Sequence, residues 1–331
     1  QSYLSPSVGG LVGGAFTALL APAIFNMVWE YPLVLVLVAL ARPWGRGPLS
    51  RGQVALLLTA AVIALSPVLL SLWLNANDAA RGRFYEIFPA GMGRLAMIML
   101  IPAAICAFLV RERALAFAGV LVMITLSAQW IARGYDWSYS ERSFFGVMRV
   151  ANAPDPMMGG DVHVLMHGTT LHGAQARNDL NECAPTLYYN VATPIGQSAL
   201  MVQKRGPARI GVVGQGSGAM AAYKRPEDRM TFFEIDPMVD ALSRDPRWFS
   251  YISDCAEGPV DTVLGDARLT LGDQPAASYD LLIIDAFSSD AVPTHLLTAE
   301  AVAGYLRLLK PEGVVLLHLS NRNLEITLPA I

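Results

Sequence analysis

The chain has 331 residues, of which 53% are hydrophobic and 15% charged, and its net charge is −3. This composition excludes an ordinary soluble globular protein. Residues 1–133 carry nine arginines and four acidic residues, whereas residues 134–331 carry 15 basic and 23 acidic residues. The division predicts a membrane region followed by an acidic soluble region. That acidity argues against nucleic acid as a partner and fits either a cationic substrate or a solvated surface.

Long uncharged runs fill the first 133 residues. Residues 1–29, 54–74 and 114–132 carry no charge, and 95–110 is a further uncharged run. A helix needs about 20 apolar residues to cross a bilayer. We therefore expect a transmembrane region over residues 1–133, with about four spans in the lipid bilayer.

Arginines in two loops bear on the orientation of these spans. One loop contains Arg42, Arg46 and Arg51, and the other contains Arg111 and Arg113. The positive-inside rule places both loops in the cytoplasm and the soluble region on the other side. The cofactor inferred below favours a cytoplasmic soluble region, and we adopt that expectation although the two arguments conflict.

The three cysteines show no metal-binding spacing. Cys106 lies in an uncharged run and is expected to be a buried apolar side chain. Cys183 and Cys255 are far apart in the sequence, and we expect free thiols, although a bridge is conceivable.

The pattern changes to short β-like runs near residue 143. Runs at 143–151, 161–167 and 187–189 are separated by turns, which predicts a small β-meander over 143–200. From residue 207, helical stretches alternate with apolar strand-like runs at 210–213, 231–233, 262–264, 281–284 and 314–318. Such alternation is typical of a parallel, doubly wound sheet. We therefore expect a Rossmann-like α/β domain over 207–331, with a C-terminus that is incomplete because this fold normally adds an antiparallel pair.

A glycine-spaced turn follows the first of these strands, with Gly214, Gly216 and Gly218. Glycines let the backbone approach a ligand closely, and the N-terminus of a following helix presents unpaired N–H groups. Glu234 lies twenty residues after Gly214, the spacing at which an acidic side chain on the next strand can reach ribose hydroxyls.

Acidic residues end three successive strands: Glu234, Asp266 and Asp285. Ligands of open α/β sheets bind at this edge. A structural alternative makes Asp266 and Asp285 helix N-caps. Three carboxylates in register beside a glycine turn favour a nucleoside site.

These motifs resemble the spermidine synthase (polyamine aminopropyltransferase) branch of the Rossmann-like methyltransferase fold. The resemblance rests on the glycine turn, the Glu-Ile-Asp at Glu234, the Gly-Asp-Ala at Gly265 and the loop from Asp285 to Pro293. It covers about residues 143–325. The whole arrangement is similar to membrane-fused bacterial relatives of this family, which implies a bacterial inner membrane, and we also consider a homodimer.

The resemblance implies a co-substrate and the residues that bind it. The donor would be decarboxylated S-adenosylmethionine, or S-adenosylmethionine itself, and no metal is implied. Glu234 would hold the ribose, and Asp266 with Ala267 the adenine edge. The glycine turn, including Ser217, would pass beneath the nucleoside. Asp285 would be the catalytic base or cation anchor beside the attacking amine.

The resemblance also implies an acceptor site for a small amine. Tyr188 and Tyr189 stand where the family has a Tyr-His pair. His167 and His172 lie five residues apart around a turn; this spacing allows metal binding, but we expect them to line the pocket or to form hydrogen bonds in the loop. Two departures concern carboxylates: Ser217 replaces an aspartate in the glycine turn, and Ser288 replaces a second one in the Asp285 loop. Asp290 is the substitute that we expect to bind substrate. We expect His295 and His318 to be structural.

Three functions follow as hypotheses. The first is a membrane-anchored aminopropyltransferase that acts on a di- or polyamine. The second is an S-adenosylmethionine-dependent methyltransferase that acts on an amine or a lipid. The third is a non-catalytic nucleoside-binding membrane protein.

Overall fold

Helices make up the first part of the chain, and two sheets form the core of the second. The computed structural model describes residues 4–42, 48–88, 91–132, 137–155, 158–168, 170–286 and 293–319. The chain divides into two units, residues 1–136 and 137–331.

The first unit consists of helices. They are α1 (Leu4–Ala15) with the π-helical turn η1 (Phe16–Leu20), α2 (Ala21–Ile24), α3 (Glu30–Leu40), α4 (Arg51–Asn75), α5 (Asp78–Ile87), α6 (Gly91–Leu109) and α7 (Ala114–Ala132). Ser50 starts α4 with a capping box. Its hydroxyl accepts the Gln53 N–H, and the Gln53 side chain accepts the Ser50 N–H. Such reciprocal bonds satisfy N–H groups that a helix start otherwise leaves unpaired.

Four helical stretches in the described part are long and apolar enough to cross a membrane: Ser7–Ile24, Arg51–Asn75, Gly91–Leu109 and Ala114–Ile131. The four long apolar helices expected from the sequence are therefore present. Leu58, Val62 and Leu69 of α4 lie exposed. A helix with apolar side chains on every face is typical of a bilayer environment.

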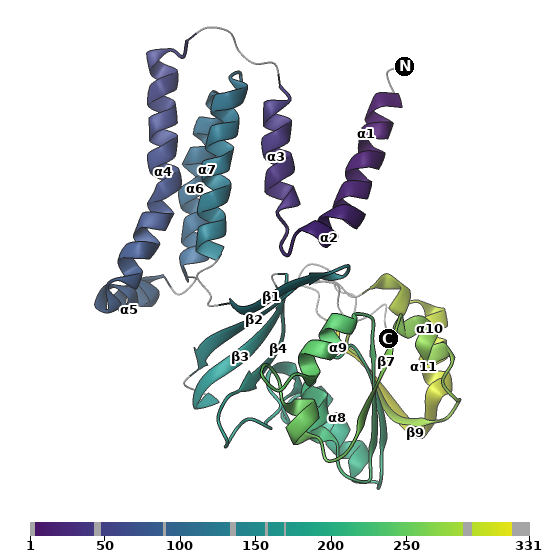
Figure 1. The fold of residues 1–331 in the computed structure, drawn as a ribbon. Helices are drawn as coiled ribbons and strands as arrows, with labels where there is room; N and C mark the ends of the chain where they lie inside the picture. The colour runs from purple at the N-terminus through teal and green to yellow at the C-terminus, as the bar shows by residue number, and fades with distance from the viewer. Residues whose placement is uncertain are drawn as a thin grey trace. The chain divides into compact units, whose positions relative to one another are not determined.

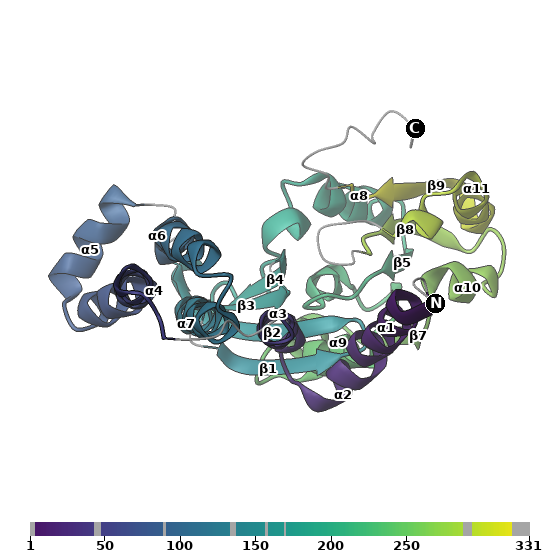
Figure 2. The same cartoon turned by 90° about the horizontal axis from the view of Figure 1, so that it is seen from above.

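Helices α4, α6 and α7 pack together (Figure 1; Figure 2). Small side chains lie between them. Ala60 and Ala64 of α4 and Ala103 and Ala107 of α6 are almost completely buried. Small residues let helix backbones approach closely, which favours packing inside a membrane. Cys106 is a free, buried thiol in the same layer, as expected.

An antiparallel sheet opens the second unit. Its strands β1 (Trp137–Ser143), β2 (Gly146–Asp155), β3 (Gly160–His167) and β4 (Thr170–Ala176) pair in chain order. The sheet starts before the expected residue 143. Ser138 alternates with Trp137 and Tyr139, but the charged Glu141 and Arg142 follow and keep this apolar run short. Its apolar side chains share a core cluster with residues 239–249 of the same unit: Met148, Val150 and Leu165 with Val239, Leu242 and Phe249.

A five-stranded parallel sheet forms the centre of the second unit (Figure 1). It contains β5 (Arg209–Val213), β6 (Arg229–Glu234), β7 (Val260–Leu264), β8 (Tyr279–Ile284) and β9 (Leu309–Leu317) in the order β7-β6-β5-β8-β9. Ile210, Leu281 and Ile283 are completely buried, as expected for strands covered on both faces. The predicted Rossmann-like fold is confirmed. The strand order reverses between β5 and β8, which is where open α/β sheets bind ligands.

Helices and short turns connect these strands. They are α8 (Pro194–Gln203), α9 (Pro237–Arg244), α10 (Ala267–Gly272), α11 (Ala299–Leu308), the 3-10 turns η3 (Leu187–Tyr189), η4 (Ala219–Tyr223) and η6 (Thr294–Leu296), and the π-helical turn η5 (Tyr251–Cys255). Two differ from expectation. Residues 187–189 form a turn rather than a strand, since Leu187 has a φ of +54°. The glycine turn leads only into the five-residue η4, because Pro226 disfavours helix at the preceding residue.

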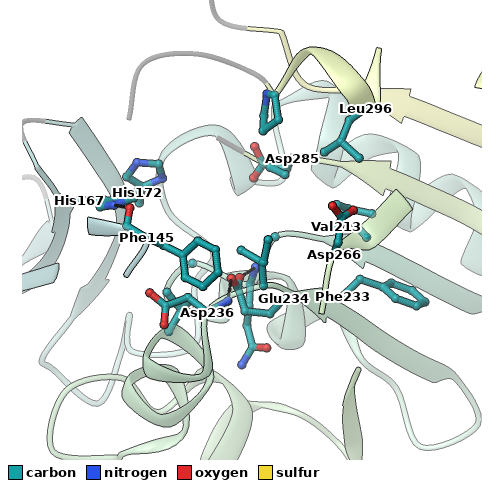
Figure 3. A pocket seen from close by; sticks show the side chains of 18 of the residues that line it. Phe145, His167, His172, Val213, Phe233, Glu234, Asp236, Asp266, Asp285 and Leu296 are labelled. Atoms are coloured by element: carbon teal, nitrogen blue, oxygen red, sulfur yellow. Dashed lines mark hydrogen bonds between the residues drawn. The ribbon is translucent and has the colours of Figure 1, made fainter. Parts of the chain in front are cut away.

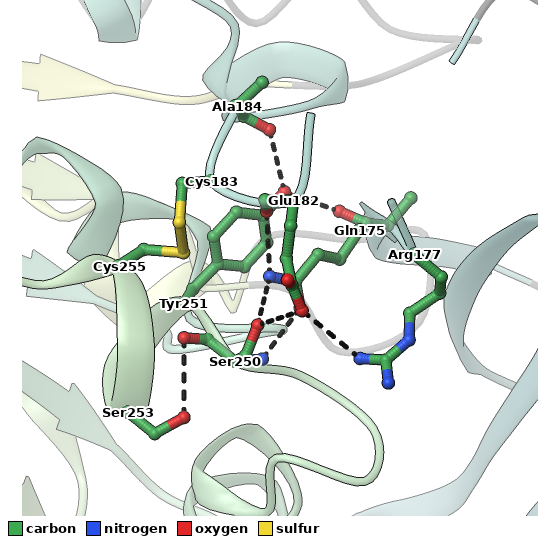
Figure 4. Close-up of a disulfide and its surroundings, with 10 residues drawn as sticks. Gln175, Arg177, Glu182, Cys183, Ala184, Ser250, Tyr251, Ser253 and Cys255 are labelled. Atoms are coloured by element: carbon green, nitrogen blue, oxygen red, sulfur yellow. Dashed lines mark hydrogen bonds and ion pairs between the residues drawn. A yellow bond between two sulfur atoms is a disulfide. The ribbon is translucent and has the colours of Figure 1, made fainter. Parts of the chain in front are cut away.

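A disulfide joins Cys183 to Cys255 (Figure 4), so the expectation of free thiols is wrong. The Tyr251 hydroxyl donates to the carbonyl oxygens of Ala174 and Ala184, both at 3.0 Å. These bonds hold the segment after β4 against η5 and bring the two cysteine Cα atoms to 5.3 Å. That separation suits a disulfide. The two cysteines are 72 residues apart in the sequence, so the sequence alone does not indicate that they meet.

Candidate active site

A cavity of about 310 Å³ opens at the carboxyl edge of the parallel sheet. Its size falls within the range of small-molecule sites. Figure 3 shows Glu234, Asp266 and Asp285 from the strand ends on one side of it and Phe145, His167 and His172 on the other, with Asp236 next to Phe145. The cavity therefore lies where the strand order reverses, between the two sheets of the second unit.

Two glycines of the turn after β5 line the cavity. Gly214 has a φ of +89° and Gly216 a φ of +53°, a region that favours glycine. A Cβ on Gly214 would clash with the carbonyl oxygen of Asp285. Glycine is therefore required where the ends of β5 and β8 meet.

The rest of the turn lies behind the cavity. Ser217 is completely buried and packs against Gly173. A Cβ on Gly173 would clash with the Ser217 side chain. The Ser217 hydroxyl has no hydrogen-bond partner among the described residues. Gly218 packs against Ile252. Neither Ser217 nor Gly218 belongs to the cavity lining, so the structure does not bring them together with the other predicted donor-binding residues.

Glu234 ends β6 and is almost completely buried in the cavity floor. Its carboxylate accepts the Gln215 N–H at 2.8 Å and the Asp236 N–H at 2.9 Å. Burial raises the pKa of the Glu234 carboxyl, and the backbone N–H groups oppose that rise. Glu234 thereby ties the glycine turn to the start of the following segment.

Asp266 precedes α10 and has two roles. One carboxylate oxygen accepts the Arg268 N–H at 2.8 Å, so Asp266 is a helix N-cap, as the structural alternative held. The other oxygen lies 3.5 Å from His295 Nε2. Asp266, Ala267 and His295 all line the cavity. His295, which was expected to be structural, is therefore a further cavity residue.

Asp285 lies one residue beyond β8, and its side chain is 2% exposed. The Tyr189 hydroxyl donates to its Oδ2 atom, and His318 Nδ1 lies 2.5 Å from its Oδ1 atom. Burial and the Asp285 charge raise the pKa of Tyr189 well above its ordinary value. Tyr189 is therefore a neutral hydrogen-bond donor at physiological pH, and Asp285 has protein partners on both oxygens.

Tyr188, Tyr189 and His172 line the cavity near Asp285. The rings of Tyr188 and Tyr189 lie 4.6 Å apart, and the Tyr188 hydroxyl donates to the His172 carbonyl oxygen at 3.5 Å. Burial, together with the charge of Asp285, raises the pKa of Tyr188. Tyr189 therefore contacts Asp285, and Tyr188 connects this part of the lining to the His172 backbone. Asp290 lies outside the described residues.

No group of three metal-ligating side chains occurs in the described parts of the chain. The rings of His167 and His172 lie 5.4 Å apart, and His167 Nε2 lies 3.0 Å from the Phe145 carbonyl oxygen. Both histidines line the cavity.

The lining carries four carboxylates, while none of the described lining residues is a lysine or an arginine. Several carboxylates in a concave site without a lysine or an arginine attract a cation and disfavour an anion. The arrangement therefore suits a ligand whose charged groups are positive.

The contact of the His318 ring with Asp285 is a feature of the site that the sequence analysis did not predict. The relevant signal is positional. Ile284 pairs with Leu317 in the β8–β9 ladder, so the residues that follow them, Asp285 and His318, are neighbours at the same sheet edge.

Comparisons with known proteins agree with the motif resemblance. No family model matches the chain. A polyamine aminopropyltransferase from Vibrio vulnificus (strain CMCP6) is 33% identical over 114 residues, which are 33% of this chain and 36% of that protein. The chain thus matches about a third of the length of this curated relative.

Two solved structures are also similar. A probable spermidine synthase from Corynebacterium glutamicum ATCC 13032 shares 22% identity over 55% of this chain and 62% of that chain, with a TM-score of 0.40. The spermidine synthase from Thermotoga maritima shares 18% identity over 54% of this chain and 55% of that chain, also with a TM-score of 0.40.

Proposed function

We propose that this protein is a membrane-anchored aminopropyltransferase that transfers an aminopropyl group from decarboxylated S-adenosylmethionine to a di- or polyamine. The observation that carries the proposal is the cavity at the sheet edge, lined by four carboxylates with no lysine or arginine among its described residues. Similarity to a polyamine aminopropyltransferase supports the same reaction.

The proposed donor pose follows the order of the strand ends. Glu234 accepts the ribose hydroxyls, and Asp266 with Ala267 contacts the adenine edge. Gly214 and Gly216 pass beneath the nucleoside, and the backbone of Ser217 and Gly218 completes the turn. The decarboxylated donor is preferred, because the carboxylate of S-adenosylmethionine would meet acidic neighbours without a guanidinium or ammonium partner.

The proposed chemistry is a displacement at carbon. The neutral acceptor amine attacks the carbon next to the sulfonium, so that a C–N bond forms while the C–S bond breaks and releases methylthioadenosine. The new ammonium then gives its excess proton to Asp285, the general base. Each carboxylate oxygen accepts more than one hydrogen bond, so the bonds from Tyr189 and His318 leave room for this proton. The reaction requires no metal.

Tyr188, Tyr189 and His172 form the proposed acceptor wall, with Asp290 as a further cation anchor. The four apolar helices anchor the enzyme in a lipid bilayer, which we propose to be the bacterial inner membrane. The proposed donor favours a cytoplasmic soluble domain. The basic loops and the Cys183–Cys255 disulfide favour the opposite side. A homodimer is the proposed assembly.

Product identification tests the proposal. Purified full-length protein is incubated with either form of the donor and a panel of amines, and products are identified by mass spectrometry. Methylthioadenosine together with an aminopropylated amine is the expected pair. S-adenosylhomocysteine with a methylated acceptor would replace the proposal by a methyltransferase. Donor binding without any product would favour the non-catalytic hypothesis.

A further inference from the structure

His318 and Asp285 are brought together by strand register. β8 and β9 pair in parallel, with Ile284 opposite Leu317, and the His318 N–H donates to the Ile284 carbonyl oxygen at 2.9 Å. The two residues that follow the paired strands therefore lie side by side at the cavity edge. Their contact is a direct consequence of the sheet and does not depend on a long loop.

The His318 ring is held on two sides. Its Nδ1 atom lies 2.5 Å from Asp285 Oδ1, and its face lies against Tyr188, with ring centroids 4.4 Å apart. The backbone N–H bond to Ile284 fixes the main chain of His318. A ring held on two sides, on a backbone that is itself fixed, has little freedom to rotate, so it can determine the orientation of the group it contacts.

His318 acts on Asp285 from outside the cavity. Asp285, Tyr188 and Tyr189 belong to the cavity lining, whereas His318 does not. The Tyr189 hydroxyl occupies Oδ2 of the carboxylate, and His318 occupies Oδ1. Each carboxylate oxygen therefore has a directional hydrogen-bond partner, and the two contacts together fix the orientation of the carboxylate plane.

We propose that His318 is a positioning residue for the general base Asp285. Its Nδ1–H donates to Oδ1, because at this distance a proton must lie between the ring nitrogen and an ionised oxygen. The bond directs the carboxylate toward the acceptor amine without contacting the amine. The catalytic effect of this positioning rests on the proposed aminopropyl transfer. The tautomer of the His318 ring does not depend on that function.

Three variants test the catalytic consequence. His318→Ala removes the donor and should lower kcat about 100-fold, a typical effect of misplacing a reacting group, with KM and donor affinity nearly unchanged. His318→Asn should recover most of the loss, since its amide N–H can occupy the place of Nδ1–H. His163→Asn is the matched control. His163 contacts the Trp248 carbonyl oxygen at 2.8 Å, lies outside the cavity lining, and should leave kcat unchanged.

Equal kcat values for the wild type, His318→Ala and the His163→Asn control would overturn the proposal. A parallel fall in kcat and thermal stability that His318→Asn does not rescue would also overturn it, because that result indicates a structural role. The measurements compare full-length proteins in the same detergent, with thermal midpoints recorded for each.

A spectroscopic measurement keeps the inference separate from the proposed function. Nitrogen-15 labelling of the five histidines allows NMR to report which ring nitrogen carries the proton, and His318→Asn identifies the His318 signal. We expect the Nδ1–H tautomer in the wild type and a shift toward Nε2–H in Asp285→Ala. Nδ1 without a proton in the neutral ring would overturn the positioning role even in an active enzyme. The expected tautomer in a protein that transfers no aminopropyl group would instead refute the proposed function alone.

Discussion

Carboxylates determine the chemistry of the cavity at the scale of single residues. Glu234 is placed by two backbone N–H groups, Asp266 caps a helix, and Asp285 is held by Tyr189 and His318. The three strand-end acids therefore differ in their partners, although they look equivalent in the sequence. Their different surroundings suit them to different parts of one ligand.

Glu234 provides a pH-dependent prediction. Its pKa is raised in the folded protein by burial, so the folded state holds its proton to a higher pH than the unfolded state. The stability contributed by this group is present below the unfolded pKa and is lost as pH rises through the folded pKa. Glu234→Gln lacks this titration. Between pH 4 and 7, the thermal midpoint of Glu234→Gln should therefore rise relative to that of the wild type as the pH rises. A constant difference across that range would refute the assignment.

Ser217 provides a second prediction at this scale. Its hydroxyl is buried without a partner among the described residues, so Ser217→Ala should keep the fold and gain up to about 1 kcal/mol. Ser217→Asp should lower the thermal midpoint strongly, since the carboxylate would be buried beside Gly173. If Ser217→Asp instead keeps the wild-type thermal midpoint and binds the amine more tightly, the side chain at position 217 faces the cavity, and its placement behind the cavity is refuted.

At the scale of elements, the sequence predicts the ends of the parallel strands well. Apolar runs followed by acidic residues located Glu234, Asp266 and Asp285 at one edge, because parallel strands end together. The same sequence does not reveal that Ser217 turns behind the cavity. That placement depends on its packing against Gly173 of β4, a contact between distant segments. The Asp285–His318 contact was available in principle from the strand register, but His318 follows an ordinary apolar strand.

The disulfide is an element-scale feature with a measurable effect. It ties the segment after β4 to η5, where Gln175, Glu182 and Ser250 also form hydrogen bonds (Figure 4). In the chain-entropy model, closing a loop of this length stabilises the fold by about 4 kcal/mol. The double variant Cys183→Ser/Cys255→Ser should therefore have a markedly lower thermal midpoint.

Cys106→Ala serves as the control for the disulfide, because Cys106 is a free thiol. It should retain the bridge in peptide mapping under non-reducing conditions. Alkylation of all three cysteines in the unreduced native protein would show that the bridge is absent.

The number of spans gives a prediction for the whole molecule. α4, α6 and α7 lie between residue 49 and the soluble domain in the sequence, so three crossings place Leu49 and the soluble domain on opposite sides of the membrane. Leu49 and Leu269 are exposed and suit single cysteine substitutions. In intact cells, a membrane-impermeant maleimide should label only one of Leu49→Cys and Leu269→Cys.

Labelling of both positions, or of neither in intact cells but both after lysis, would contradict three crossings. The identity of the labelled position also reports the orientation. A labelled Leu49→Cys agrees with the cytoplasmic placement that the donor favours. A labelled Leu269→Cys agrees with the basic loops and the disulfide.

Aminopropyl transfer at Asp285 can be tested with one paired measurement. Wild-type protein and Asp285→Asn are incubated with decarboxylated S-adenosylmethionine and the amine panel, while donor binding is measured by calorimetry. The wild type should release methylthioadenosine with an aminopropylated amine. Asp285→Asn should bind the donor and lose turnover by about 10²- to 10⁴-fold, the usual contribution of a general base. Undiminished turnover in Asp285→Asn, or methyl transfer by the wild type, would contradict the account.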